Sequence, residues 1–338
     1  MSEKRVPQHL IRLNDLSPQQ VDDLLELSTR LKRKGTRAEL AGRTVGLLFF
    51  RGSLRTRASF EAAMVQLGGN TINLTAASDF WDLEVREGAV MDGRAPEHIR
   101  DAAAVLSSYV NALAIRPKPA GRSWAEDRKD SEIRSWADHA RVPVINMESA
   151  LWHPLQALAD LLTLRETLGD VRGKRLSVVW THSPTPATPA VVHSLVHGAV
   201  RAGMHVRVAH PQGYELDTQV LEEVSTLAKT SGGSFETGLP LVEGVRGSHV
   251  VYARSWESLE DYGNPTLAAS RRSRQQGWAV DERLMAQGAD ARLMHAMPVR
   301  RNLEVTDEVL DGPRSLIVQQ AENRLHSQKA LLTHMLRG

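Results

Sequence analysis

The stretch TVGLLFFRGSLRTRASFEAAMVQLGG, residues 44–69, decides the fold class of this 338-residue chain. Residues 44–50 form a short, uninterrupted apolar run, which is typical of a strand buried on both faces of a parallel sheet. Residues 59–67 have helical spacing and are followed by Gly68-Gly69, a common way to end a helix. A strand that leads through a short polar turn into a helix predicts an α/β unit.

The same alternation of strands and helices continues along the rest of the chain. In the first half we predict helices at 17–34, 59–67 and 97–109, and strands at 44–50, 70–74, 112–115 and 142–146. The pattern restarts near residue 150, with predicted helices at 155–168, 190–202, 215–231 and 321–336, and strands at 175–180, 205–209, 249–253, 292–295 and 315–318. The sequence therefore predicts an α/β protein of two domains, each a parallel sheet flanked by helices, joined by a long interdomain helix. We place the domains at 1–150, with a C-terminal helix 321–338 packing back on it, and at 151–320.

Composition excludes several classes of protein. The chain has no cysteine, which rules out disulfides, cysteine-ligated zinc, iron–sulfur clusters and a thiolate nucleophile. The 42 basic and 40 acidic residues give a net charge of only +2 without a basic run, so we expect no nucleic-acid partner. No run of 18 apolar residues and no signal-peptide pattern occurs, so we expect no membrane span and a cytoplasmic protein.

Standard cofactor and hydrolase fingerprints are also missing. The chain contains no G-x-G-x-x-G, no G-x-x-x-x-G-K-[ST] and no G-x-S-x-G, so we expect no dinucleotide, no P-loop nucleotide and no nucleophile elbow. We expect neither a metal nor an organic cofactor.

The motif S-L-R-T-R, residues 53–57, lies between the first predicted strand and its helix. Backbone N–H groups at the start of a helix attract anions, and hydroxyl and guanidinium groups add donors and bidentate charge. Together these groups can enclose a phosphate. The residues alone leave a second interpretation open, a polar N-cap followed by two solvated arginines.

Two further motifs carry polar side chains next to predicted strands. His153-Pro154-Leu155-Gln156 places a histidine and an amide one helical turn apart, where both can hydrogen-bond one carbonyl oxygen. His295-Ala296-Met297-Pro298 follows a strand, at the edge where open α/β sheets bind ligands. By themselves these motifs also fit a helix-start histidine and surface polar residues.

Taken together and in this order, S-L-R-T-R, H-P-L-Q, H-x-x-P and a late A-E-N-R resemble the aspartate/ornithine carbamoyltransferase family. The resemblance extends from about residue 40 to 336. It implies a first domain that binds carbamoyl phosphate, a second that binds the amine substrate, and a homotrimer with active sites shared between subunits. A non-catalytic, ligand-sensing family member is the alternative, and the intact motifs argue against it.

Within this family the sequence resembles the N-acylornithine branch. Plain ornithine enzymes carry H-C-L-P and an Asp followed by Ser-Met-Gly that holds a free α-amino group. Here the corresponding segments are residues 295–298 and Ala253-Arg254-Ser255-Trp256. The acetyl type has a glutamate three residues after a Met-Asp-Gly turn, where this chain has Pro96. Because a carboxylate there would repel the carboxylate of a succinyl group, Pro96 favours N-succinyl-L-ornithine, with N-acetylornithine and plain ornithine as alternatives.

The resemblance also implies roles for individual residues. Carbamoyl phosphate is expected to contact Ser53, Leu54, Arg55, Thr56, Arg57, Arg116, His153, Gln156, Met297, Arg324 and a neighbouring subunit's Trp81. Thr56, Arg116, His153 and Gln156 are the expected catalytic residues, which polarise the carbonyl oxygen. The acylornithine is expected to contact Trp81, Pro96, Glu148, Arg254, His295 and Ala296. The expected reaction yields N-acylcitrulline and phosphate in arginine biosynthesis.

Overall fold

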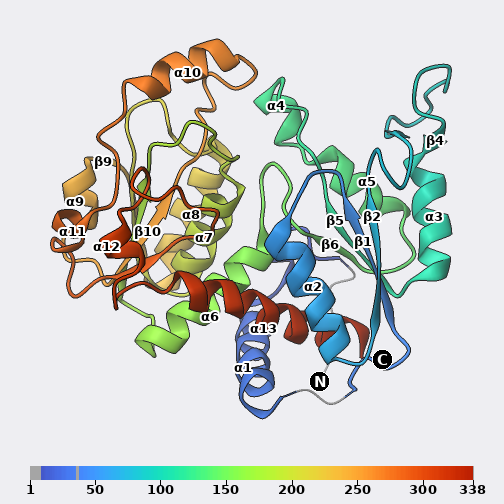
Figure 1. The fold of residues 1–338 in the computed structure, drawn as a ribbon, viewed down its shortest axis with the longest axis horizontal. Helices are drawn as coiled ribbons and strands as arrows, with labels where there is room; N and C mark the ends of the chain where they lie inside the picture. The colour runs from blue at the N-terminus through green and yellow to red at the C-terminus, as the bar shows by residue number, and fades with distance from the viewer. Residues whose placement is uncertain (1–8, 36–37, 338) are drawn as a thin grey trace. The chain divides into compact units, whose positions relative to one another are not determined.

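A computed structural model describes residues 9–35 and 38–337. Residues 1–8, 36–37 and 338 lie outside the described residues. Residues 1–8 belong to the N-terminal stretch for which we expect no signal peptide. The chain divides into two compact units. Unit 1 comprises Met1–Pro119, Arg128–Leu158 and Arg324–Gly338, and unit 2 comprises Ala120–Asp127 and Ala159–Asn323. Each unit contains one main parallel sheet with helices around it (Figure 1), and unit 1 also contains a two-stranded parallel sheet of residues 83–84 and 97–98, which confirms the predicted fold class.

The helices and strands have the following bounds. The strands are β1 (Thr44–Phe49), β2 (Asn70–Thr75), β3 (Leu83–Glu84), β4 (Glu97–His98), β5 (Ala112–Arg116), β6 (Val144–Asn146), β7 (Arg175–Trp180), β8 (His205–Ala209), β9 (Ser234–Leu239), β10 (Val250–Arg254) and β11 (Arg292–Met294). The helices are η1 (Leu13–Asp15), α1 (Pro18–Lys34), α2 (Leu54–Gln66), α3 (Ile99–Tyr109), α4 (Trp124–Asp127), α5 (Ser131–His139), α6 (Pro154–Leu168), α7 (Ala190–Arg201), α8 (Thr218–Ser231), α9 (Leu241–Val245), α10 (Pro265–Ser273), α11 (Glu282–Met285), α12 (Asp307–Leu310) and α13 (Ile317–Leu336).

The sheet of unit 1 has the strand order β2-β1-β5-β6, and all its pairs are parallel. The chain runs from β1 outward to β2 and then returns to the other side of β1 as β5. The direction of winding therefore reverses between β1 and β5. Helices α3 and α5 pack Ile99, Ile133 and Trp136 against strand residues such as Leu48 and Leu113. The reversal matters because ligands of open α/β sheets bind outside the strand ends at such a point.

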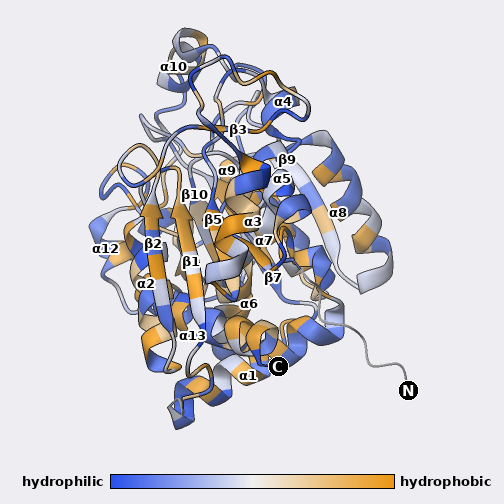
Figure 2. Cartoon of the chain, turned by 90° about the vertical axis from the view of Figure 1, so that its right-hand side faces the viewer, coloured by the Kyte–Doolittle hydropathy of each residue, from blue (hydrophilic) through white to orange (hydrophobic). Residues whose placement is uncertain are grey.

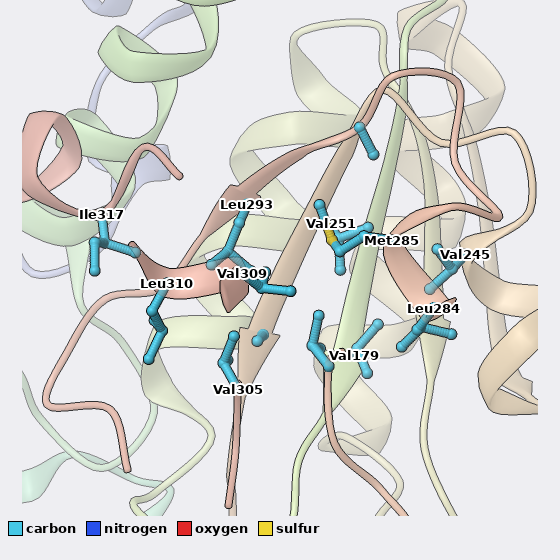
Figure 3. Packing of buried hydrophobic residues seen from close by; sticks show 13 residues of the cluster. Val179, Val245, Val251, Leu284, Met285, Leu293, Val305, Val309, Leu310 and Ile317 are labelled. Carbon is cyan, nitrogen blue, oxygen red and sulfur yellow. The ribbon is translucent and has the colours of Figure 1, made fainter. Parts of the chain in front are cut away.

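The sheet of unit 2 has the order β11-β10-β7-β8-β9 and is also parallel. Its winding reverses between β7 and β10. One face is covered by a cluster in which Val179, Val251 and Leu293 from three strands meet Leu284 and Met285 from α11 (Figure 3). This cluster fixes the strands whose ends carry the candidate residues of this unit.

Local sequence explains the elements that were predicted correctly. In β1, five consecutive buried residues match the apolar run. Helix α1 begins with a capping box between Ser17 and Gln20 and has Pro18 at its first position. In Figure 2 the strand β1 is mainly orange, whereas α8 alternates between blue and orange, as expected for a helix with one buried face.

Some expectations were wrong or incomplete. The helix predicted at 59–67 starts at Leu54, because Ser53 adopts the extended N-cap conformation, so most of the S-L-R-T-R motif forms the first helical turn. The strand predicted at 315–318 does not form: Ser315 makes one isolated bridge to Leu293, and α13 begins at Ile317. The half-exposed edge strand β9 was not predicted, because its sequence has no continuous apolar run.

Candidate functional site

The winding reversal of unit 1 brings the end of β1 next to the end of β5. Phe49 pairs with Arg116 in the sheet, and the N–H of Phe50 donates to the carbonyl of Arg116 over 3.0 Å. The chain then turns into α2, whose N-cap is Ser53. The guanidinium of Arg116 and the first turn of α2 are therefore both placed at the ligand-binding edge of this sheet.

The start of α2 offers donors for an anion. Within the described residues, the Ser53 hydroxyl makes no capping hydrogen bond. Leu54 is 79% exposed, whereas Thr56 is buried. The first N–H groups of a helix have no partner within the helix, and they lie at the positive end of its dipole.

Arg324 connects three of the predicted residues. Its Nη2 donates to the Thr56 hydroxyl over 2.7 Å, and its Nη1 donates to Oε1 of Gln156 over 2.9 Å. All three side chains are buried, and so is His153 at the start of α6. Burial lowers the pKa of His153 well below its usual value, assisted by nearby arginines, so the imidazole is neutral near pH 7. A neutral His153 can donate one hydrogen bond to a substrate oxygen without carrying charge.

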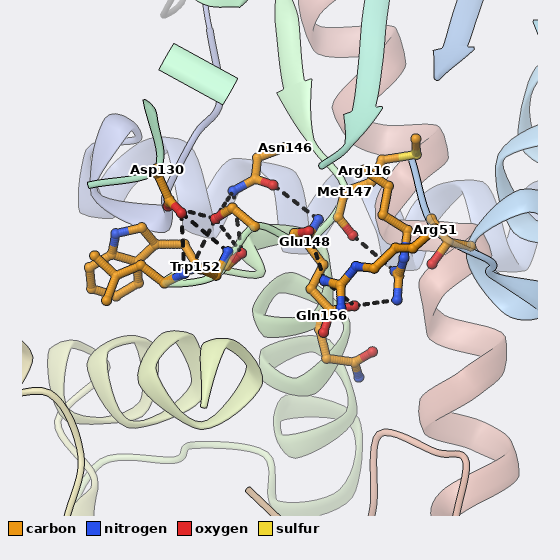
Figure 4. Close-up of polar contacts among 12 residues, drawn as sticks. Arg51, Arg116, Asp130, Asn146, Met147, Glu148, Trp152 and Gln156 are labelled. Carbon is orange, nitrogen blue, oxygen red and sulfur yellow. Dashed lines mark hydrogen bonds and ion pairs between the residues drawn. The ribbon is translucent and has the colours of Figure 1, made fainter. Parts of the chain in front are cut away.

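Glu148 is the carboxylate of this cluster. Its Oε2 lies 2.5 Å from Nη2 of Arg116 and 3.5 Å from Nη2 of Arg51 (Figure 4). Arg51 also donates to the carbonyl of Glu148 over 3.0 Å. The Glu148 side chain is only 6% exposed, so the ion pairs are little screened by water. One carboxylate thus holds two guanidinium groups, and the cluster keeps a net positive charge.

A buried polar network holds the loop that carries Glu148. The backbone of Glu148 has a φ of +143°, a conformation rarely adopted by residues other than glycine. Its N–H donates to Oδ1 of Asn146 over 3.0 Å, and the Ser149 hydroxyl donates to Asp130 over 2.6 Å (Figure 4). Asp130 also accepts from the N–H groups of Ala150 and Leu151. These contacts fix a strained backbone so that the Glu148 carboxylate faces Arg116.

Other predicted residues of unit 1 lie apart from this cluster. Arg57 packs over the Phe49 ring at 4.3 Å and donates to the Thr75 hydroxyl over 2.8 Å. Trp81 is 70% exposed, and Pro96 is exposed in a later part of the same segment. Within the described residues, no hydrogen bond or ion pair connects Trp81 or Pro96 to Arg116.

The winding reversal of unit 2 carries Arg254. This residue ends β10, pairs with Trp180 in the sheet, and accepts at its carbonyl the N–H of Thr181 over 3.1 Å. Arg254 is buried, yet no carboxylate of the described residues forms an ion pair with it, and its Nε has no hydrogen-bond partner there. A buried cation without a counter-ion is costly, so this position is suited to an anionic ligand.

Hydroxyl groups accompany Arg254 at the same strand ends. The hydroxyls of Thr181 and Ser255 are buried and lack hydrogen-bond partners among residues 9–35 and 38–337. Sequence reasoning missed both, although Thr181 directly follows a predicted strand and Ser255 follows another with one residue between, positions at which ligand contacts are expected. It also missed Arg51 and Asp130, whose partners are distant in sequence.

The H-A-M-P segment of unit 2 is held by its own side chains. His295 is buried, its Nε2 lies 2.9 Å from Oε2 of Glu304, and its Nδ1 lies 2.9 Å from the N–H of Met297. Met297 has a φ of +54°. Ala296 lies between these two residues. The segment therefore presents its backbone in a fixed conformation.

The described residues contain neither a cluster of metal ligands nor a membrane-spanning helix. Among them, no group of three or more His, Cys, Asp or Glu side chains could hold a metal ion. His193 and His197 lie one turn apart on α7 but are not part of such a group. None of the helices that the structure describes has the length and apolar character needed to cross a membrane.

Comparisons of the sequence with known proteins point to one family. Residues 8–166 match the carbamoyl-P binding domain of aspartate/ornithine carbamoyltransferases, and residues 187–335 match their Asp/Orn binding domain. An N-acetylornithine carbamoyltransferase of Xanthomonas campestris pv. campestris is 38% identical over 331 residues, which are 97% of this chain and 97% of the relative. An ornithine carbamoyltransferase of Gloeobacter violaceus is 36% identical over 330 residues, which are 97% of this chain and 96% of the relative.

Solved structures are similar over nearly the whole chain. An acetylornithine transcarbamylase complexed with acetylcitrulline has a TM-score of 0.95 and 38% identity, covering 97% of this chain and 99% of the other. An N-acetyl-L-ornithine transcarbamylase in which a glutamate is replaced by proline, complexed with carbamyl phosphate and N-succinyl-L-norvaline, has a TM-score of 0.94 and 39% identity, with the same coverage.

Proposed function

The chain belongs to the aspartate/ornithine carbamoyltransferase family, and we propose that it transfers the carbamoyl group of carbamoyl phosphate to the δ-amine of an N-acylornithine. The observation that carries the choice of amine is the buried Arg254. It has no carboxylate partner among the described residues and is followed by Ser255-Trp256 in place of a segment that grips an α-ammonium group. Such a site accepts a substrate with a free carboxylate and an acylated, uncharged α-nitrogen.

Carbamoyl phosphate binding is assigned to the first domain, residues 1–150 with the C-terminal helix 321–338. The first turn of α2, with Ser53, Leu54, Arg55, Thr56 and Arg57, would surround the phosphate, together with Trp81 of a neighbouring subunit in a homotrimer. Arg57 must leave Thr75 to reach it. Support comes from the open helix N-terminus and from the cationic cluster around Arg116.

The carbonyl oxygen of carbamoyl phosphate would be polarised by Thr56, Arg116, His153 and Gln156. Negative charge develops on this oxygen as the amine attacks, and fixed donors stabilise it most in the transition state. The ion pair with Glu148 holds the Arg116 guanidinium in place before substrate arrives. We assign the carbamoyl NH₂ group to the Met297 carbonyl and Arg324.

The reaction is a displacement at the carbonyl carbon. The lone pair of the neutral δ-amine forms the new C–N bond, and the bond from the carbonyl carbon to the phosphate oxygen breaks. Phosphate departs with this electron pair and takes the proton released by the attacking nitrogen. The enzyme then contributes mainly positioning and electrostatic stabilisation, and the products are an N-acylcitrulline and phosphate, a step of arginine biosynthesis.

The second domain, residues 151–320, would bind the N-acylornithine. Arg254 would face its α-carboxylate, with Glu148, His295 and Ala296 near the same substrate. For the acyl group we propose succinyl, because Pro96 stands where the acetyl type has a glutamate. One of the similar solved structures supports this choice: an N-acetyl-L-ornithine transcarbamylase in which a glutamate is replaced by proline is complexed with N-succinyl-L-norvaline.

N-acetylornithine is the second candidate substrate. Relatives at 36–39% identity are named N-acetylornithine carbamoyltransferases, and these names by themselves favour acetyl over succinyl. Plain ornithine follows, because ornithine carbamoyltransferases reach 38% identity.

A citrulline assay with carbamoyl phosphate and ornithine, N-acetylornithine or N-succinylornithine in parallel tests the proposal. We expect product with the acylated amines and the highest kcat/KM with the succinyl compound. Product with ornithine alone contradicts the N-acylornithine assignment, and no product with any amine contradicts carbamoyl transfer.

The role of Pro96 is tested by Pro96→Glu. An added carboxylate should repel the succinyl carboxylate, so the ratio of kcat/KM for succinyl- over acetylornithine should fall about 10-fold or more. Pro96→Ala removes the ring without adding charge and serves as the matched control, for which the ratio should stay within about twofold. An unchanged ratio in Pro96→Glu contradicts the role of this position.

A further inference from the structure

Glu304 and His295 form a buried pair in unit 2. The Glu304 Oε2 lies 2.9 Å from the His295 Nε2, and the exposed fractions of the two side chains are 6% and 0%. Both are anchored by the hydrophobic cluster of Figure 3, because Leu293 precedes His295 by two residues and Val305 directly follows Glu304. The pair therefore has little freedom to separate.

The contacts of His295 define its tautomer. The backbone N–H of Met297 can only donate, so the His295 Nδ1, 2.9 Å away, must accept. In a neutral imidazole the proton is then on Nε2, where it points toward the Glu304 carboxylate. A carboxylate at this position favours the Nε2–H form and strengthens Nδ1 as an acceptor.

A second set of contacts holds the backbone of His295. Its N–H donates to Oε1 of Gln320 over 2.8 Å, and Nε2 of Gln320 donates to Oδ1 of Asp160 over 2.7 Å. The Tyr252 hydroxyl donates to the other oxygen of Asp160 over 3.1 Å. With its main chain and both ring nitrogens engaged, His295 is a support for the segment that follows it.

We propose that Glu304 is a positioning residue: through the tautomer of His295 it fixes the backbone of Met297, whose carbonyl orients the carbamoyl group. The proposal rests on the function proposed above, which assigns the carbamoyl NH₂ to this carbonyl. Met297 has a φ of +54°, a conformation that costs free energy in a residue with a side chain and therefore needs support from its surroundings. The hydrogen bond from its N–H to His295 supplies that support.

The experiment compares Glu304→Ala, Glu304→Gln and the exposed Glu308→Ala on the neighbouring helix α12. Loss of the acceptor should lower kcat about 10- to 100-fold in Glu304→Ala, while KM for the N-acylornithine changes less than about threefold. Glu304→Gln keeps an acceptor oxygen and should recover at least half of this loss on a logarithmic scale. Glu308→Ala should match the wild type.

The tautomer gives a readout that a merely structural role would not change. In ¹⁵N-histidine-labelled protein, with His295 assigned from the spectrum of His295→Gln, the wild type should show protonated Nε2, and Glu304→Ala should show a mixture. A wild-type His295 protonated at Nδ1 overturns the proposal whatever the activity, and so does an unchanged kcat in Glu304→Ala. Failure of the wild type to carbamoylate any amine instead contradicts the proposed function, so the two failures are distinguishable.

Discussion

In each of the two sheets, a strand beside the winding reversal ends in an arginine: Arg116 ends β5 and Arg254 ends β10. The two arginines have different surroundings. Arg116 in unit 1 is paired with the buried Glu148, which also holds Arg51. Arg254 in unit 2 is buried without a carboxylate partner in the described part of the chain. A pre-paired arginine is held in one geometry and suits the stabilisation of charge that develops during a reaction. An arginine without a counter-ion suits a ligand that brings its own negative charge.

The largest expected effect comes from Arg116→Ala. Removing a fixed donor to the carbonyl oxygen should lower kcat/KM about 10³-fold. It also removes the shorter of the two ion pairs that Glu148 makes with Arg116 and Arg51, so unfolding free energy should fall by about 2 kcal/mol. Steady-state kinetics and urea unfolding measure the two effects, with the exposed Arg33→Ala as control. Activity within threefold of wild type contradicts the assigned role.

The loop that fixes Glu148 can be tested through pH. Burial raises the pKa of Asp130 to about 6 from 3.8, although hydrogen bonds from Ser149 and Leu151 oppose the shift. Because the native state binds more protons than the unfolded state between about pH 4 and 6, this group's contribution to stability falls as pH rises through that window.

Asp130→Asn carries no titrating charge at this position. Its unfolding free energy should therefore rise relative to wild type by about 3 kcal/mol between pH 4 and pH 7. Urea unfolding at the two pH values measures the difference, and the exposed Asp138→Asn should follow the wild type. Parallel pH curves for wild type and Asp130→Asn argue against a raised pKa.

The smallest of these effects is expected for Arg254→Met. Losing the partner of the substrate carboxylate should raise KM for the N-acylornithine about 30-fold, with a smaller change in kcat. Removal of an uncompensated buried charge should leave Tm in the absence of substrate unchanged or higher, the opposite of Arg116→Ala. A clear loss of Tm would show that Arg254 is paired within the protein.

Much of the architecture follows from local sequence. Sequence patterns identified eight of the strands, β1, β2, β5, β6, β7, β8, β10 and β11, and the motifs at 53–57, 153–156 and 295–298 lie beside strand or helix ends as expected. The edge strand β9, the two-residue strands β3 and β4, and the helices α4, α5 and α9–α12 were missed, because most of them are half exposed or only a few residues long. At Leu316 and Ile317 an apolar pattern that suits a strand instead starts the helix α13, since the surroundings override local propensity.

The pairings inside the site could not be predicted from sequence. Arg51 and Glu148 are 97 residues apart, and their contact depends on a backbone conformation that no local pattern indicates in a glutamate. Asp130 precedes the loop that it holds by about 20 residues and contacts it through buried hydrogen bonds. His295 and Glu304 are nearer in sequence. The tautomer of His295 that faces Glu304, however, can be assigned only from the hydrogen bond that the Met297 N–H donates to Nδ1.

The contrast between the two arginines is tested most directly by calorimetric titration of carbamoyl phosphate, without amine, into the wild type, Arg116→Ala and Arg254→Met. This contrast predicts that Arg116→Ala weakens binding about 30-fold or more, while Arg254→Met binds within about threefold of wild type. Equal weakening in both variants, or wild-type affinity in Arg116→Ala, would contradict it.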